Sequence, residues 1–146
     1  MTQLRPPGLD ALGLPAALRW HAGAFESRTG IRVKVTADET LPRPSPAVKD
    51  VLLRIYIEAL NNVANHAAAR RVAVSLEARG DAVVTSIADQ GRGIDATQRM
   101  RRDDISGGGL MIMEERARSV GAELRIHSAP GEGTRVEFVI SRDKWS

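Results

Sequence analysis

Four segments of alternating apolar and polar residues form two pairs, and only a short glycine-containing turn separates the members of each pair. The first pair is 71–78 and 82–89, joined by Gly-Asp, and the second is 122–128 and 134–141, joined through PGEG. Alternation with period two predicts half-buried strands, and connections this short form antiparallel hairpins. The pattern therefore argues against a doubly wound parallel sheet, which needs a crossover after each strand.

Apolar residues that recur every three or four positions predict helices in the rest of the chain. These helices cover 9–29, 46–68 and 110–120, and Gly30 supplies a stop for the first. Residues 31–36 alternate and predict a further strand. The resulting order is α, β, α, β, β, loop, α, β, β. It predicts an α/β fold, a two-layer sandwich whose mixed, mostly antiparallel sheet carries helices on one face.

Composition excludes several classes of protein. A chain of 146 residues suits one domain over 1–146, and it has no cysteine for disulfides, zinc ribbons or thiol chemistry. Its 21 Lys and Arg against 18 Asp and Glu are a small basic surplus, and only 3% of the residues are aromatic, so base-stacking platforms are scarce. No apolar run approaches a membrane span, and the N-terminus lacks the apolar core of a signal peptide. We therefore expect a cytoplasmic domain with no direct nucleic-acid contact.

Three polar residues interrupt the apolar face of the helix predicted over 46–68. Glu58, Asn62 and His66 are spaced at i, i+4 and i+8, on or at the edge of the side that the periodicity would bury. Burying such groups without partners costs about 1–3 kcal/mol each. They form either an internally satisfied polar network or the wall of a cleft whose carboxylate and amide oxygens suit a hydrated Mg²⁺.

Glycine-rich segments follow the strands. Asp89 ends a strand and opens DQGRG, and its carboxylate can accept hydrogen bonds from an exocyclic amino group such as that of adenine. SGGGL (106–110) opens a helix, where bared backbone N–H groups favour phosphate. GEGT (131–134) places the hydroxyl of Thr134 at the start of the last strand. Each segment alone is also typical of an ordinary turn, linker or hairpin.

Competing phosphate-binding and catalytic motifs are absent or incomplete. No P-loop, G-x-S-x-G or H-E-x-x-H occurs. GRGIDA (91–96) matches a dinucleotide-binding pattern, but the short, polar stretch after it does not predict the apolar helix which that motif requires. The segment 91–109 has no apolar period and predicts a loop.

Four segments in order resemble a known family. They are EALNNVANHA (58–67), DQGRG (89–93), GGGLMIMEERA (107–117) and PGEGT (130–134). They resemble the N, G1, G2 and last glycine boxes of the ATP-binding catalytic domain of two-component sensor histidine kinases, which has the Bergerat (GHKL) fold. The similarity extends to the subgroup that pairs with response regulators of the LuxR/NarL type, whose members carry a stretch like LRPPGLDALGLPAALRW after their dimerisation helices.

The resemblance implies roles for individual residues. Asn62 would coordinate the Mg²⁺ that bridges the ATP phosphates, and Glu58, at the general-base position of related ATPases, would hold a water or polarise the acceptor histidine. Asp89 would bind the adenine amino group, with Thr134 helping through a water, and 94–109 would be a mobile lid. Other residues would contact ATP or shape its pocket: Asn65, His66, Gly91, Gly93, Ile94, Gly107, Gly108, Gly109 and Leu110.

The sequence departs from the subgroup at three positions and lacks one motif. Asn65 stands where the subgroup usually has Lys, Gln90 where it has Asp or Asn, and Glu114 where it has Arg. These changes bear on catalytic rate and nucleotide affinity more than on fold. No segment matches the phosphoacceptor box E-L-H-D. We therefore expect the catalytic part of a longer kinase, which by itself binds ATP without forming phosphohistidine.

The implied partners are a dimerisation and phosphoacceptor domain and a response regulator of the LuxR/NarL type. Any membrane anchor would belong to other parts of the parent protein. Two alternatives remain: a serine kinase of the anti-sigma type on the same fold, and a degenerate binding module that no longer uses ATP.

Overall fold

The computed structural model describes residues 13–67, 69–90, 109–129 and 131–146. Its sheet has five strands in the order β1-β2-β3-β5-β4. The strands are β1 (Arg32–Ala37), β2 (Arg71–Arg79), β3 (Ala82–Asp89), β4 (Glu123–Ala129) and β5 (Gly133–Ser141). The helices are α1 (Leu14–Thr29), α2 (Pro46–Asn62), the π-helix η2 (Val63–Ala67), α4 (Gly109–Ser119) and α5 (Arg142–Trp145).

Strand pairing confirms the predicted mixed sheet. β1 pairs with β2 in parallel, and the other three pairs are antiparallel. β2 and β3 form a hairpin whose last register pair is Arg79 and Ala82. β4 and β5 form the second hairpin. A parallel pair needs a crossover, and α2 supplies it between β1 and β2.

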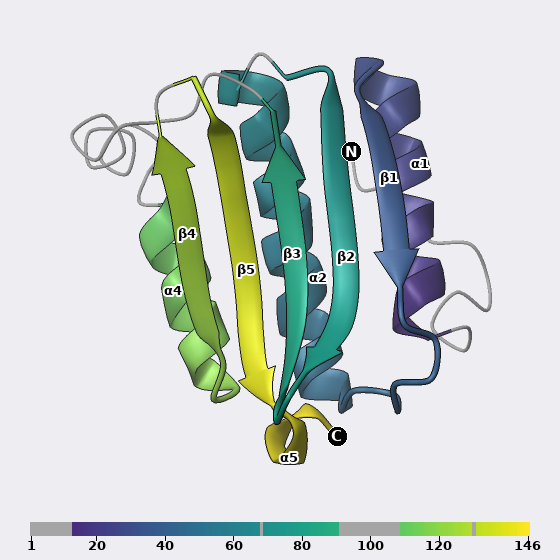
Figure 1. Cartoon of the computed structure of the whole chain (residues 1–146), viewed down its shortest axis with the longest axis vertical. Coiled ribbons are helices and arrows are strands. Elements are labelled where there is room, and N and C mark those ends of the chain that lie inside the picture. Colours follow the sequence, from purple (N-terminus) through teal and green to yellow (C-terminus); the bar gives the residue numbers. More distant parts are fainter. Residues whose placement is uncertain (1–12, 68, 91–108, 130) are drawn as a thin grey trace.

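The helices α1, α2 and α4 lie on one face of the sheet, as predicted (Figure 1). Most side chains on that face are apolar and buried, for example Val72, Val74 and Leu76 of β2. They alternate with polar residues on the other face because successive strand residues point to opposite sides. The core therefore lies between the sheet and these helices, which gives the two-layer α/β sandwich expected from the sequence.

The start of α2 follows from local chemistry. The Ser45 hydroxyl accepts a hydrogen bond from the Val48 N–H at 3.2 Å, and Pro46 stands at the first helical position. Within α2, Tyr56 is fully buried and its hydroxyl donates to the Leu18 carbonyl of α1 at 2.8 Å. Burial in this apolar interface raises the pKa of Tyr56 far above its ordinary value, and the charge of Glu26 adds to the shift.

The observed element bounds differ from the predicted ones at several element ends. The first helix begins at Leu14 because Gly13 has φ +89°, outside the helical region; residues 9–12 are outside the described part of the chain. The helix predicted over 46–68 is α-helical only to Asn62 and continues as η2. Gly109, the last residue of the loop predicted over 91–109, already belongs to α4.

The terminal helix α5 was not predicted, because four residues are too few to show a helical period. Trp145 is 1% exposed, and its indole N–H donates to the Pro42 carbonyl at 2.7 Å. The Trp145 carbonyl accepts the Ser45 N–H at 2.8 Å. The C-terminal helix therefore holds the segment that leads into α2. Among the described residues, no helix has the length and apolar character needed to cross a bilayer.

Candidate functional site

The predicted site residues come from element ends that meet at one end of the sheet. The C-terminal ends of α2 and β3 lie there together with the N-terminal ends of β5 and α4 (Figure 1). This follows from topology, because α2 and β3 run in one direction while β5 and α4 start where they end. Residues separated in sequence by a strand or a helix are thereby placed around one region.

Glu58 and Asn62 lie one turn apart on α2 and are both half-buried. Neither side chain makes a hydrogen bond or an ion pair with another described residue. An internally satisfied polar network through these two groups is therefore absent from the described part of the chain. The side chain of His66, the third member of the predicted stripe, lies outside the described part. The two α2 residues leave a carboxylate and an amide available to a ligand.

Asp89 ends β3 and is 8% exposed. Its Oδ1 accepts a hydrogen bond from the backbone N–H of Thr134 at 3.3 Å. The hydroxyls of Thr134 and Ser128 lie 3.0 Å apart and share a hydrogen bond. The carboxylate is thus oriented by the start of β5, and a chain of polar groups continues from it to the end of β4.

Gly133 explains how β5 comes so close to Asp89. The glycine has φ +82°, and a Cβ built on it would overlap the Asp89 carbonyl oxygen and lie 3.0 Å from its carbonyl carbon. Glycine has no Cβ, so it can approach this closely and adopt a positive φ without a steric clash. The segment GEGT, which alone predicted only a hairpin, therefore also supplies the close approach that holds Thr134 against Asp89.

The structure describes only some of the other predicted site residues. Asn65 lies exposed in η2, and Gly109 is the first residue of α4, followed by Leu110 in its first turn. The remaining glycines and the isoleucine predicted to contact ATP lie outside the described residues: Gly91, Gly93, Ile94, Gly107 and Gly108. The lid predicted over 94–109 stays a prediction. The departures Asn65, Gln90 and Glu114 are exposed, whereas Asp89 is buried.

Ser128 was missed by the sequence analysis. Its hydroxyl contacts that of Thr134 and donates to the Gly133 carbonyl at 3.4 Å. A serine at the end of a strand is common, so its own position gives little signal. Only the register of the hairpin, in which Ser128 is paired with Thr134, could have identified it.

The donor atoms fit the Mg²⁺ that the resemblance implies. Magnesium prefers oxygen ligands, keeps several waters and is usually held by one or two protein groups together with substrate phosphates. The amide oxygen of Asn62 and the carboxylate of Glu58 are such groups, and they have no partner among the described residues. No cluster of three or more His, Cys, Asp or Glu suited to a metal ion occurs in the described residues.

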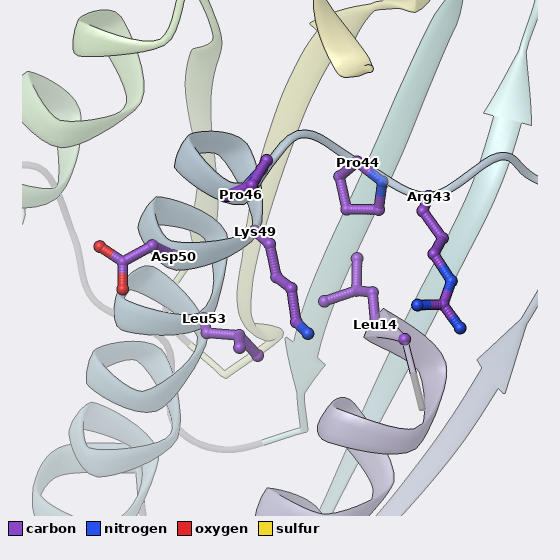
Figure 2. A pocket seen from close by; sticks show the side chains of 8 residues that line it. Leu14, Arg43, Pro44, Pro46, Lys49, Asp50 and Leu53 are labelled. Atoms are coloured by element: carbon purple, nitrogen blue, oxygen red, sulfur yellow. The ribbon is translucent and has the colours of Figure 1, made fainter. Parts of the chain in front are cut away.

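A cavity of about 470 Å³ lies elsewhere, between the beginnings of α1 and α2 (Figure 2). Lys49 extends there between Leu14 and Leu53, with Arg43 and Pro44 on one side (Figure 2). The N-terminal end of α2 forms one wall, whereas Asn62 is at the C-terminal end of that helix. None of the predicted ATP-binding residues lines this cavity.

Comparison with known proteins identifies relatives of the whole domain. The family model described as histidine kinase-, DNA gyrase B- and HSP90-like ATPase matches residues 47–144. The oxygen sensor histidine kinase NreB of Staphylococcus carnosus is 35% identical over 140 residues, which are 94% of this chain and 39% of that protein. The sensor histidine kinase LiaS of Bacillus subtilis is 31% identical over 140 residues, 96% of this chain and 37% of that protein.

A solved structure gives the same result for the fold. The histidine kinase domain of the blue-light activated histidine kinase EL346 from Erythrobacter litoralis has a TM-score of 0.72 and 25% sequence identity, over 90% of this chain and 62% of that one. The chain spans less than two fifths of the sequence relatives named above. The matched family, the fold and these relatives agree: the chain belongs to the histidine kinase-, DNA gyrase B- and HSP90-like ATPase family and is homologous to the ATPase domains of sensor histidine kinases.

Proposed function

We propose that this domain binds Mg-ATP where α2, β3 and β5 meet, and that it transfers the γ-phosphoryl group to a histidine of a separate dimerisation domain. The observation that carries the proposal is the pair Glu58 and Asn62, half-buried and without partners among the described residues. Asp89, at the same end of the sheet, supplies a buried carboxylate. Because the chain belongs to a family of ATPases, a nucleotide is the ligand that fits these groups best.

Each residue then has a chemical task. Asp89 accepts a hydrogen bond from the adenine amino group, and Thr134 supports it through its backbone N–H and its hydroxyl. Asn62 would offer its amide oxygen to the Mg²⁺, which when bound would neutralise phosphate charge. Glu58 holds a water or polarises the acceptor imidazole. In the transfer, an imidazole nitrogen bonds to the γ-phosphorus while the bond to the β-phosphate oxygen breaks and ADP leaves. Catalysis rests on positioning and electrostatic stabilisation.

The proposed partners follow from the relatives. Because the chain matches only part of each sensor histidine kinase, we propose that its parent protein also carries a dimerisation domain. The phosphoryl group would then pass to an aspartate of a response regulator, which we propose is of the LuxR/NarL type. We propose that the domain works in the cytoplasm. No observation favours the anti-sigma serine kinase or the degenerate binding module over this function.

The test is a calorimetric titration of the chain with a non-hydrolysable ATP analogue, with and without Mg²⁺. Asp89→Asn keeps the size of the side chain but replaces one acceptor oxygen by an amide that must face the adenine amino group. Hydrogen bonds to charged groups contribute about 1.5–3 kcal/mol, so affinity should fall about 10- to 100-fold. Asp50→Asn, an exposed carboxylate at the other end of α2, is the control. Equal affinities of the two variants would refute the assignment of adenine to Asp89.

A further inference from the structure

A polar contact links α1 to the last turn of α2. The Arg28 guanidinium Nη2 donates to the Asn61 side-chain oxygen at 3.1 Å, across 33 residues of sequence. The same guanidinium lies 5.6 Å from the centre of the Phe25 ring. Phe25 is 3% exposed and so is held by the core. Cation–π attraction to this fixed ring restrains the guanidinium that contacts Asn61.

Asn61 directly precedes Asn62, and the two side chains diverge by about 100° around the helix. A contact that holds Asn61 against α1 therefore restrains the last turn of α2, from which Asn62 also projects. α2 ends at Asn62, and the backbone continues as a π-helix through Ala67. The Val63 N–H is shared between the carbonyls of Ala59 and Leu60, so the regular hydrogen-bond ladder changes at this turn.

A small cavity, open to solvent, lies at the same place. It has a volume of about 60 Å³, and residues of both α1 and α2 line it: His21, Phe25, Arg28, Ile57, Leu60 and Asn61 are among them. The Arg28–Asn61 hydrogen bond spans the two helices beside this cavity and connects them at the nucleotide end.

We propose that Arg28 is a positioning residue for the nucleotide site: through Asn61 it fixes the orientation of Asn62 toward the Mg-nucleotide. This inference rests on the proposed function, namely on Asn62 as the protein ligand of the metal. Arg28 itself touches neither metal nor nucleotide in this scheme. Its removal should weaken the Mg²⁺-dependent part of binding and leave the adenine-dependent part intact.

The experiment measures affinity for a non-hydrolysable ATP analogue with and without Mg²⁺, and takes the ratio of the two affinities. Arg28→Ala should lower this ratio about two- to tenfold, the range expected for loss of one hydrogen bond, and leave the affinity without Mg²⁺ unchanged. Asn61→Ala should have the same effect. The double variant should lose no more than either single variant, because the two residues act through one contact.

Arg54→Ala is the matched control. Arg54 is also an exposed arginine, but it pairs with Asp50 at 3.2 Å, about two turns before Asn62. Its removal takes away the same charge without touching the last turn, so the ratio should stay at the wild-type value. A general effect of charge would lower the ratio equally in Arg28→Ala and Arg54→Ala, and would overturn the inference.

Asn62→Ala separates this inference from the function on which it rests. If Asn62→Ala abolishes the effect of Mg²⁺ while Arg28→Ala and Asn61→Ala leave the ratio unchanged, the positioning role is wrong and the proposed function stands. If Asn62→Ala itself leaves the ratio unchanged, the proposed metal ligand is wrong and the inference falls with it. Additive losses in the Arg28→Ala/Asn61→Ala double variant would also overturn it.

Discussion

Gly133 allows a sharp test of how the β4–β5 hairpin builds the site. In Gly133→Ala the new Cβ would meet two difficulties: φ is +82°, and the Cβ would overlap the Asp89 carbonyl oxygen while lying 3.1 Å from the Gln90 Cα. The backbone conformation costs about 1–2 kcal/mol for a residue with a Cβ. Overpacking that forces the backbone to shift costs about 1–3 kcal/mol more. The free energy of unfolding should therefore fall by about 2–5 kcal/mol.

Gly131→Ala is the natural control for this substitution. Gly131 lies in the same turn with φ +79°, but a Cβ there would meet no described residue within 4 Å. Only the conformational cost of about 1–2 kcal/mol should remain. The difference between the two variants isolates the close approach to Asp89 and should be about 1–3 kcal/mol.

Urea unfolding followed by tryptophan fluorescence measures both free energies. The same proteins should be titrated with the ATP analogue. Because the methyl group added in Gly133→Ala would push β5 away from Asp89, affinity should fall more in this variant than in Gly131→Ala. Surface substitutions usually change the free energy of unfolding by no more than about 0.5 kcal/mol. If the free energies of the two variants differ by less than this, β3 and β5 do not approach each other as closely as in the structure.

Two further predictions concern buried side chains of the core. The chain has one tyrosine, and burial raises the pKa of Tyr56, so its neutral form is favoured in the folded protein. Its contribution to stability is complete below the unfolded pKa of about 10 and is lost as the pH rises above that value. Tyrosinate absorbance should therefore appear only as the protein unfolds in alkali, and Tyr56→Phe should lessen the alkaline loss of stability; titration of Tyr56 near its ordinary pKa in the folded chain would contradict this. Trp145→Phe leaves the Pro42 carbonyl without the indole donor, so the free energy of unfolding should fall by about 1–3 kcal/mol in a urea titration; an unchanged midpoint would show that α5 does not hold the segment before α2.

Much of the fold could be predicted because its signals are local. The alternation in 71–78 and 82–89 and the turn between them predicted the β2–β3 hairpin, and the structure confirms it. The apolar period over 46–68 predicted α2, and Ser45 and Pro46 define its start through neighbours in sequence. The change to a π-helix after Asn62 was not predictable, because no residue propensity distinguishes it from the α-helix that it continues.

The site was only partly predictable for a different reason. The sequence alone determined which side chains we propose for the chemistry: a carboxylate and an amide one turn apart on α2, and an aspartate at the end of a strand. Period and residue type can be read along the chain without its tertiary structure. Tertiary structure alone decided that Asp89 meets Thr134, 45 residues away, and that Arg28 meets Asn61. Such contacts depend on strand register and helix packing, and many different sequences of the same local pattern could place these residues apart.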